Sequence, residues 1–180
     1  SRSRMEQIVN DILFDFNVKP RLSGGRGNAM LVAGSIYEAC RYYKLFQETE
    51  LKGQCAVVTS YQPDRQDVRD EEMGTSSETE KQFVYNLYKE ILGDQSTEQY
   101  EDAAKEKFRK EPANMKLLIV VNKLLTGFDA PPCTYLYIDH TMQDHGLFQA
   151  ICRTNRLDGE DKDFGHIVDY KDLFKKVENA

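Results

Sequence analysis

Gln149, Arg153 and Arg156 are the residues of this sequence whose types and spacing are best suited to chemistry. In the segment GLFQAICRTNR they stand four and three positions apart, so that on a helix they project from nearly the same side. Two close guanidinium groups repel each other unless an anion lies near both, and their planar donors suit phosphate oxygens. The spacing therefore indicates a phosphate site, with a triphosphate as a natural ligand. On spacing alone, a solvated helix face whose arginines pair with the acidic residues at 158–161 explains the pattern equally well.

The elements that must position this helix are short apolar runs that alternate with segments of helical spacing. The apolar runs have the continuous character of strands covered on both faces of a parallel sheet, and they occupy 29–33, 55–59, 116–121, 134–139 and 165–170. Helices are expected at 3–16, 35–49, 78–92, 97–110, 146–156 and 171–179. This alternation predicts a single domain spanning 1–180, an α/β three-layer sandwich with a mainly parallel sheet.

Local signals refine the amino-terminal part of this prediction. Ser3 and Glu6 have the spacing of a capping box, which predicts Ser3 as the N-cap of the first helix. The glycine cluster GGRGN at 24–28 is interpreted as a turn, because it precedes a strand. The loops that follow the strands are expected to carry the function, as they do in parallel sheets.

Composition and charge argue against several classes of protein. The net charge of −6 argues against a protein that holds nucleic acid by bulk attraction, so any DNA contact must be local. The acidic segment 64–80 is interpreted as a solvated loop and helix start. The apolar runs are too short to span a membrane, and no leader opens the chain, which predicts a cytoplasmic protein. The four cysteines form no CxxC pair and the three histidines show no ligand spacing, so we expect reduced buried thiols and no metal site.

Three segments of the chain carry a family resemblance. They are LLTGFDAP at 124–131, MQDHGLFQAICRTNR at 142–156 and GHIVDY at 165–170. Together they resemble the second motor domain of the R subunit of type I restriction enzymes, which belong to the superfamily 2 helicases and translocases. In that superfamily a Gly-x-Asp turn is motif V, and Gln-x-x-x-Arg-x-x-Arg is motif VI. The resemblance implies a RecA-like three-layer α/β/α sandwich.

The resemblance also implies roles for the residues that match these motifs. Arg153 and Arg156 match the arginines that reach ATP from the second motor domain, and Arg156 is the stronger candidate for the finger on the γ-phosphate. Gln149 would couple the two motor domains. Gly127 and Asp129 match the turn that faces the nucleotide and the domain interface.

Three hydroxyl residues are the candidates for contacts to the DNA backbone. Thr126 lies in the motif V turn, whereas Ser35 and Thr59 stand at the ends of the first two predicted strands. The glycines that wider superfamily 2 members carry before the motif VI arginines are replaced by Cys152 and Asn155. By resemblance, this departure is in the style of the restriction subunits.

Half of an ATP site is missing from the sequence. There is no GxxxxGK[ST] loop and no DExH box, so ATP and Mg²⁺ would be bound mainly by a first motor domain elsewhere in a larger polypeptide. The isolated chain is therefore expected to be inactive, although the resemblance implies that it is part of an ATP-dependent type I site-specific deoxyribonuclease and translocase. The resemblance implies further partners: double-stranded DNA, a nuclease domain of the same polypeptide, and modification and specificity subunits. Two alternatives stay open, namely another superfamily 2 helicase or remodeller, and a non-motor anion-binding or interaction domain.

Overall fold

A computed structural model of the chain describes residues 2–64, 77–121, 128–140 and 165–171. In chain order the elements are α1 (Arg2–Val18), α2 (Pro20–Ser23), β1 (Asn28–Ala33), α3 (Ile36–Phe46), β2 (Cys55–Val58), α5 (Glu78–Leu92), α6 (Thr97–Lys110), β3 (Leu117–Val121), β4 (Cys133–Asp139) and β5 (His166–Asp169). All five predicted strands are confirmed, as are the four predicted helices that fall within these residues. The helices expected at 146–156 and 171–179 lie outside the described residues, except for the first position of the second one.

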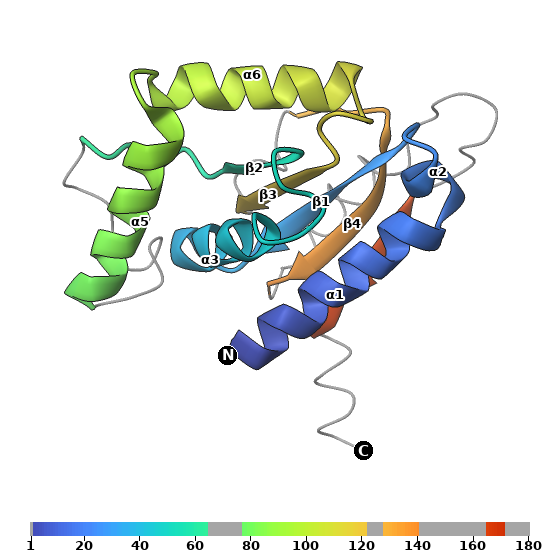
Figure 1. The fold of residues 1–180 in the computed structure, drawn as a ribbon, viewed down its shortest axis with the longest axis horizontal. Coiled ribbons are helices and arrows are strands. Elements are labelled where there is room, and N and C mark those ends of the chain that lie inside the picture. Colours follow the sequence, from blue (N-terminus) through green and yellow to red (C-terminus); the bar gives the residue numbers. More distant parts are fainter. Residues whose placement is uncertain (1, 65–76, 122–127, 141–164, 172–180) are drawn as a thin grey trace.

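The five strands form one sheet in the order β2-β3-β1-β4-β5, and every neighbouring pair is parallel. The prediction of a mainly parallel sheet is therefore confirmed, and the sheet is parallel throughout its described strands. Because β3 lies between β1 and β2, the chain first moves to one side of β1 and later returns across it to reach β4 (Figure 1). All carboxyl ends consequently meet at one edge of the sheet, where ligands of such folds bind.

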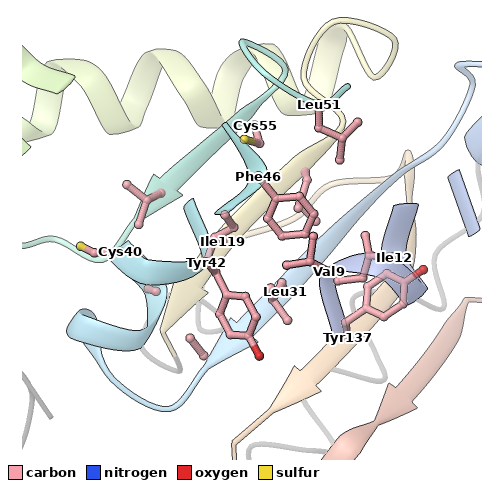
Figure 2. Close-up of a cluster of buried hydrophobic side chains, with 14 of the residues drawn as sticks. Val9, Ile12, Leu31, Cys40, Tyr42, Phe46, Leu51, Cys55, Ile119 and Tyr137 are labelled. Atoms are coloured by element: carbon pink, nitrogen blue, oxygen red, sulfur yellow. The ribbon is translucent and has the colours of Figure 1, made fainter. Parts of the chain in front are cut away.

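Helices cover both faces of the sheet. On one face α1 and α3 pack over side chains such as Leu31 and Tyr137 (Figure 2), and buried residues of α5 join the same cluster. Phe46 of α3 is fully buried there, and burial of an apolar side chain of this size stabilises a fold by roughly 2 to 3 kcal/mol. On the other face Phe108 of α6 packs with Leu118 and Val120. The continuous apolar character of the strands follows from this double covering.

The helix starts show where local signals decide the structure. The predicted helix start near Ser35 is confirmed: Ser35 is the N-cap of α3, and its Oγ accepts a hydrogen bond from the Glu38 N–H at 3.1 Å. The prediction of Ser3 as an N-cap is wrong, because α1 begins at Arg2 and includes Ser3. The Glu6 carboxylate accepts from Arg2 at 2.9 Å, so the group that a capping box would use is engaged by a side chain.

The expectation of buried, reduced thiols is met for the cysteines that the structure describes. Cys40, Cys55 and Cys133 are free, buried thiols, whereas Cys152 lies outside the described residues. Burial raises the pKa of Cys40 and of Cys55 to about 12. No helix of the described ranges is long and apolar enough to cross a bilayer.

Candidate functional site

Two of the predicted site residues that the structure describes, Ser35 and Thr59, lie at the carboxyl edge of the sheet, whereas Asp129 lies just before β4, near the amino ends of the strands. Ser35 follows β1, Thr59 follows β2, and Asp129 lies between β3 and β4. The other predicted site residues lie outside the described residues, namely Thr126, Gly127, Gln149, Arg153 and Arg156. The geometry of the motif VI helix therefore stays a prediction, while the edge that precedes it can be built from its contacts.

The end of β1 is closely packed against the end of β4. A Cβ atom at Gly34 would lie 3.1 Å from Glu38 Oε2 and 3.4 Å from His140 Nδ1, which is tighter than most Cβ contacts. Ser35 is buried, with 7% of its surface exposed, because its hydroxyl caps α3. The cap uses an acceptor lone pair of Oγ, and the hydroxyl proton stays able to bond to an oxygen at the surface. A phosphate contact by Ser35 is compatible with this geometry and stays a prediction.

The end of β4 is fixed by a buried carboxylate that sequence reasoning missed. Asp139 is 1% exposed, forms an ion pair with Arg4 of α1, and accepts a hydrogen bond from the Tyr42 hydroxyl at 2.5 Å. Burial and the neighbouring Asp139 carboxylate raise the pKa of Tyr42, so the phenol stays protonated and donates. Burial lowers the pKa of Arg4, but its hydrogen bond to Asp139 and the attraction of that charge raise it more, and the net pKa is raised. Two helices are thereby tied to the strand that leads into the segment of the predicted arginines.

The end of β2 is held by a second buried carboxylate. Glu101 of α6 is 5% exposed and its Oε2 accepts hydrogen bonds from the Thr59 N–H at 2.9 Å and the Ser60 N–H at 3.0 Å. Burial raises the pKa of Glu101, although these two N–H groups pull it in the opposite direction. Ser60 has φ 66°, a left-handed conformation that a side chain other than glycine seldom adopts. The hydrogen bonds to Glu101 therefore hold the backbone turn after β2 in a conformation that serine alone does not favour.

The side chain of Thr59 is committed to the interior. Its Oγ1 lies 2.5 Å from the Tyr88 hydroxyl and accepts from the Tyr61 N–H at 3.3 Å, and the residue is 5% exposed. Ser60, by contrast, is exposed at the same turn. Ser60 is thus a residue that the strand-end argument passed over, and its place directly after an apolar strand was the signal that could have found it.

Asp129 follows a residue that anchors its segment to α6. Phe128 is buried with its ring centroid 6.1 Å from that of Phe108, and the Arg109 guanidinium lies 5.8 Å from the Phe128 ring centroid. Asp129 itself is half-buried and has an interaction partner. The carboxyl half of the predicted Gly-x-Asp turn is therefore held against the face of the sheet that α6 covers.

The described edge is built to position groups rather than to react. Its two buried carboxylates, Asp139 and Glu101, accept hydrogen bonds that hold the backbone and the helices in place. Within the described residues no group of three or more histidine, cysteine or acidic side chains could hold a metal ion. Chemistry at this edge would therefore depend on the loops that the strands support.

An all-parallel sheet in the order β2-β3-β1-β4-β5, covered by helices on both faces, is a RecA-like three-layer α/β/α sandwich. Its fold is similar to the solved C-terminal part of the Fun30 ATPase domain, with a TM-score of 0.50 and 12% identity, over 97% of this chain and 44% of that one. Residues 25–172 match the family described as type I restriction enzyme subunit R domain 3. The chain belongs to this family.

Curated relatives agree with the family. The SauCOLORF180P endonuclease subunit of a Staphylococcus aureus type I restriction enzyme is 30% identical over 163 residues, which cover 85% of this chain and 17% of the relative. The putative MjaIXP endonuclease subunit of Methanocaldococcus jannaschii is 32% identical over 166 residues, covering 92% of this chain and 14% of the relative. The chain thus spans about a sixth of the length of these relatives.

Proposed function

We propose that this chain is the second motor domain of an ATP-dependent double-stranded DNA translocase within a type I restriction endonuclease. The observation that carries the proposal is the family match over residues 25–172, which includes the segments resembling motifs V and VI. The all-parallel sheet supports it, because its carboxyl edge supplies the strand ends on which such motifs are mounted. The same family match favours this reading over a helicase or remodeller of another superfamily 2 class.

The ATP side of the proposal rests on the residues after β3 and β4. Arg156 would stabilise charge that develops on the γ-phosphate, Arg153 would bind the phosphates beside it, and Gln149 would link the two motor domains. Gly127 and Asp129 would face the nucleotide across the domain interface. ATP and its Mg²⁺ would be held mainly by the first motor domain, for which this sequence carries no binding loop.

The DNA side of the proposal rests on strand ends. Ser35 and Thr126 are proposed to contact backbone phosphates, which position a duplex without reading its sequence. The third predicted contact, Thr59, is not proposed, because its hydroxyl is buried against that of Tyr88. Ser35 suits this role best among the described residues, because its hydroxyl proton is free of the capping bond. The Ser60 turn, held by Glu101, would supply the neighbouring surface.

The remaining partners follow from the family and are proposed with it. The first motor domain and a nuclease domain would belong to the same polypeptide, and modification and specificity subunits would complete the enzyme in the cytoplasm of a bacterium or archaeon. The relatives named as endonuclease subunits are several times longer than this chain, as such an arrangement requires. The isolated chain should therefore hydrolyse no ATP.

DNA-stimulated ATP turnover of the full-length polypeptide, assembled with its partner subunits, tests the proposal. We expect Arg156→Ala to lower turnover by about a thousandfold, the usual worth of an arginine finger, and Arg153→Ala to lower it less. Lys52→Ala, which removes an exposed charge from the turn before β2, is the control and should leave turnover unchanged. Normal turnover in both arginine variants would contradict the proposal and favour the alternative, in which Arg153 and Arg156 form surface salt bridges.

A further inference from the structure

A hollow on the outer face of α3 carries cations that the strand-end site does not use. This α3 groove has a volume of about 230 Å³ and is lined by Arg2, Tyr37, Arg41, Lys44, Glu48 and Phe83. Arg2 comes from the first turn of α1 and Phe83 from α5, so three helices form its walls. On a chain with a net charge of −6, such a gathering of basic groups is a local exception.

The spacing of α3 explains why these side chains share one face. Tyr37, Arg41 and Lys44 stand four and three positions apart, which aligns them along one side of the helix. The opposite side of α3 is committed to the core through Tyr42 and Phe46, both of which are fully buried. The polar face of α3 is therefore fixed in place by the packing of its apolar face.

Among the described residues, no carboxylate forms an ion pair with Arg41 or Lys44. On α6, by contrast, Lys105 and Lys110 pair with Asp102 and Glu106. Glu48 lines the same groove, yet no ion pair joins it to either cation among those residues. Two cations that face a hollow and form no ion pair with the described carboxylates are suited to an anion supplied from outside.

Two further charged residues near the groove, Arg2 and Glu80, have interaction partners of their own. Arg2 pairs with Glu6 at 2.9 Å. Glu80 lies close enough to Tyr37 to contribute to the raised pKa of its phenol, for which burial is the larger cause. Because acidic groups flank the groove, it suits one local phosphate group rather than a broad polyanion surface.

The aromatic wall of the α3 groove complements a sugar and phosphate backbone. The ring centroids of Tyr37 and Phe83 lie 5.9 Å apart, edge to face, and the Arg41 guanidinium lies 5.7 Å from the Tyr37 ring centroid. Such a stack orients the Arg41 guanidinium, whose five N–H donors exceed what one contact to the Tyr37 hydroxyl can use. A deoxyribose could pack against the rings while its phosphate meets Arg41 and Lys44.

The α3 groove lies on the helix that starts at the carboxyl edge of the sheet. The helix that carries its cations begins directly after Ser35, at the carboxyl end of β1 (Figure 1). We infer that Arg41 and Lys44 form an additional binding site for a DNA backbone phosphate, beyond the strand-end contacts. The inference rests on the proposed function, since it names a further part of the path of the same duplex.

Binding of a fluorescently labelled duplex of random sequence to the full-length R polypeptide, titrated at several salt concentrations, tests this inference. Arg41→Gln with Lys44→Gln should raise the dissociation constant about tenfold near 0.1 M salt and flatten the slope of log affinity against log salt by about two units. The control is Lys52→Gln with Lys110→Gln, which also removes two positive charges, both from exposed residues outside the groove. The control variant should change the dissociation constant and the salt slope by no more than about a third of the amounts expected for the groove variant.

Three results would overturn the inference. One is an unchanged dissociation constant and salt slope in the groove variant, and another is a wild-type polypeptide that does not bind duplex at low salt. The third is unchanged duplex binding with lost assembly to the partner subunits, which would make the groove a protein interface. Turnover of the assembled enzyme at saturating DNA separates this failure from that of the proposed function: Arg156→Ala should abolish turnover, whereas the groove variant should retain it.

Discussion

The Asp139 carboxylate joins α1 and α3 at the end of β4, because it pairs with Arg4 and accepts a hydrogen bond from the Tyr42 hydroxyl at 2.5 Å. Three segments far apart in the sequence thereby converge on one buried group. The strand it ends leads directly into the segment that holds the predicted motif VI arginines. Asp139 thus links the fold to the proposed ATP chemistry without taking part in it.

Replacing Asp139 with asparagine should destabilise the chain by about 2 to 3 kcal/mol, because it leaves the Arg4 charge without its partner. We place the loss below that of a fully buried pair, since about a quarter of the Arg4 side chain is exposed. Tyr42→Phe keeps the packing, removes only the hydroxyl, and should cost about 1 kcal/mol. Urea unfolding measures both. Equal stability of Asp139→Asn and wild type would show that the ion pair contributes nothing.

The Glu101 carboxyl should give the chain a pH-dependent stability. Its pKa is raised above the ordinary value of 4.5, so the folded state holds the proton more tightly than the unfolded state. The stabilising contribution is complete below the unfolded pKa and is lost as the pH rises through the folded pKa. Glu101→Gln cannot titrate, so the stability difference between wild type and variant should shrink as pH rises from about 4 to 7. A difference independent of pH over this window would contradict the assignment.

Ser60 should tolerate glycine better than any β-branched residue. Its φ of 66° is imposed by the hydrogen bonds to Glu101, and a left-handed residue other than glycine costs about 1 to 2 kcal/mol. Ser60→Gly should therefore be neutral or stabilising by up to about 1 kcal/mol, whereas Ser60→Val should be destabilising by at least about that amount. Thermal unfolding distinguishes the two, and the reverse order would show that the turn is not left-handed.

Buried thiols should resist alkylation in the folded chain. With a pKa of about 12, Cys40 and Cys55 carry almost no thiolate at pH 8, and both are buried. In a Cys152→Ser background, iodoacetamide at pH 8 should label fewer than a tenth of the remaining thiols before unfolding and all of them in urea. Rapid labelling of folded protein, with mass spectrometry locating the adduct on Cys40 or Cys55, would contradict this burial.

Much of the fold was readable from the sequence, because its strands are buried on both faces. Runs such as AMLVA and LLIVV have no amphipathic alternation, and this absence indicated a parallel sheet under two helical layers. The serine before α3 identified its start. The start of α1 was misplaced, since an ion pair between Arg2 and Glu6 leaves no capping box there. The four-residue α2, with Pro20 at its first turn, is too short to show a helical periodicity of apolar residues in the sequence.

The contacts of the site were harder to predict, because they join residues distant in sequence. Nothing local relates Glu101 to Ser60, or Arg4 to Asp139, until α6 and α1 are packed onto the sheet. In the sequence Thr59 looked as accessible as Ser35, but in the structure its hydroxyl is hydrogen-bonded to the hydroxyl of Tyr88 from α5. Strand ends can therefore be located from apolar runs, whereas the direction in which their hydroxyls point depends on the tertiary structure.

Movement along DNA tests the central claim most directly. Displacement of a third strand from a triplex, placed on the duplex far from the recognition site, reports translocation by the assembled enzyme. We predict that Arg156→Ala abolishes ATP-driven displacement while the complex still assembles and binds duplex, and that Lys52→Ala displaces the strand at the wild-type rate. Displacement by Arg156→Ala at the wild-type rate would contradict the assignment of this chain as the domain that completes the ATP site.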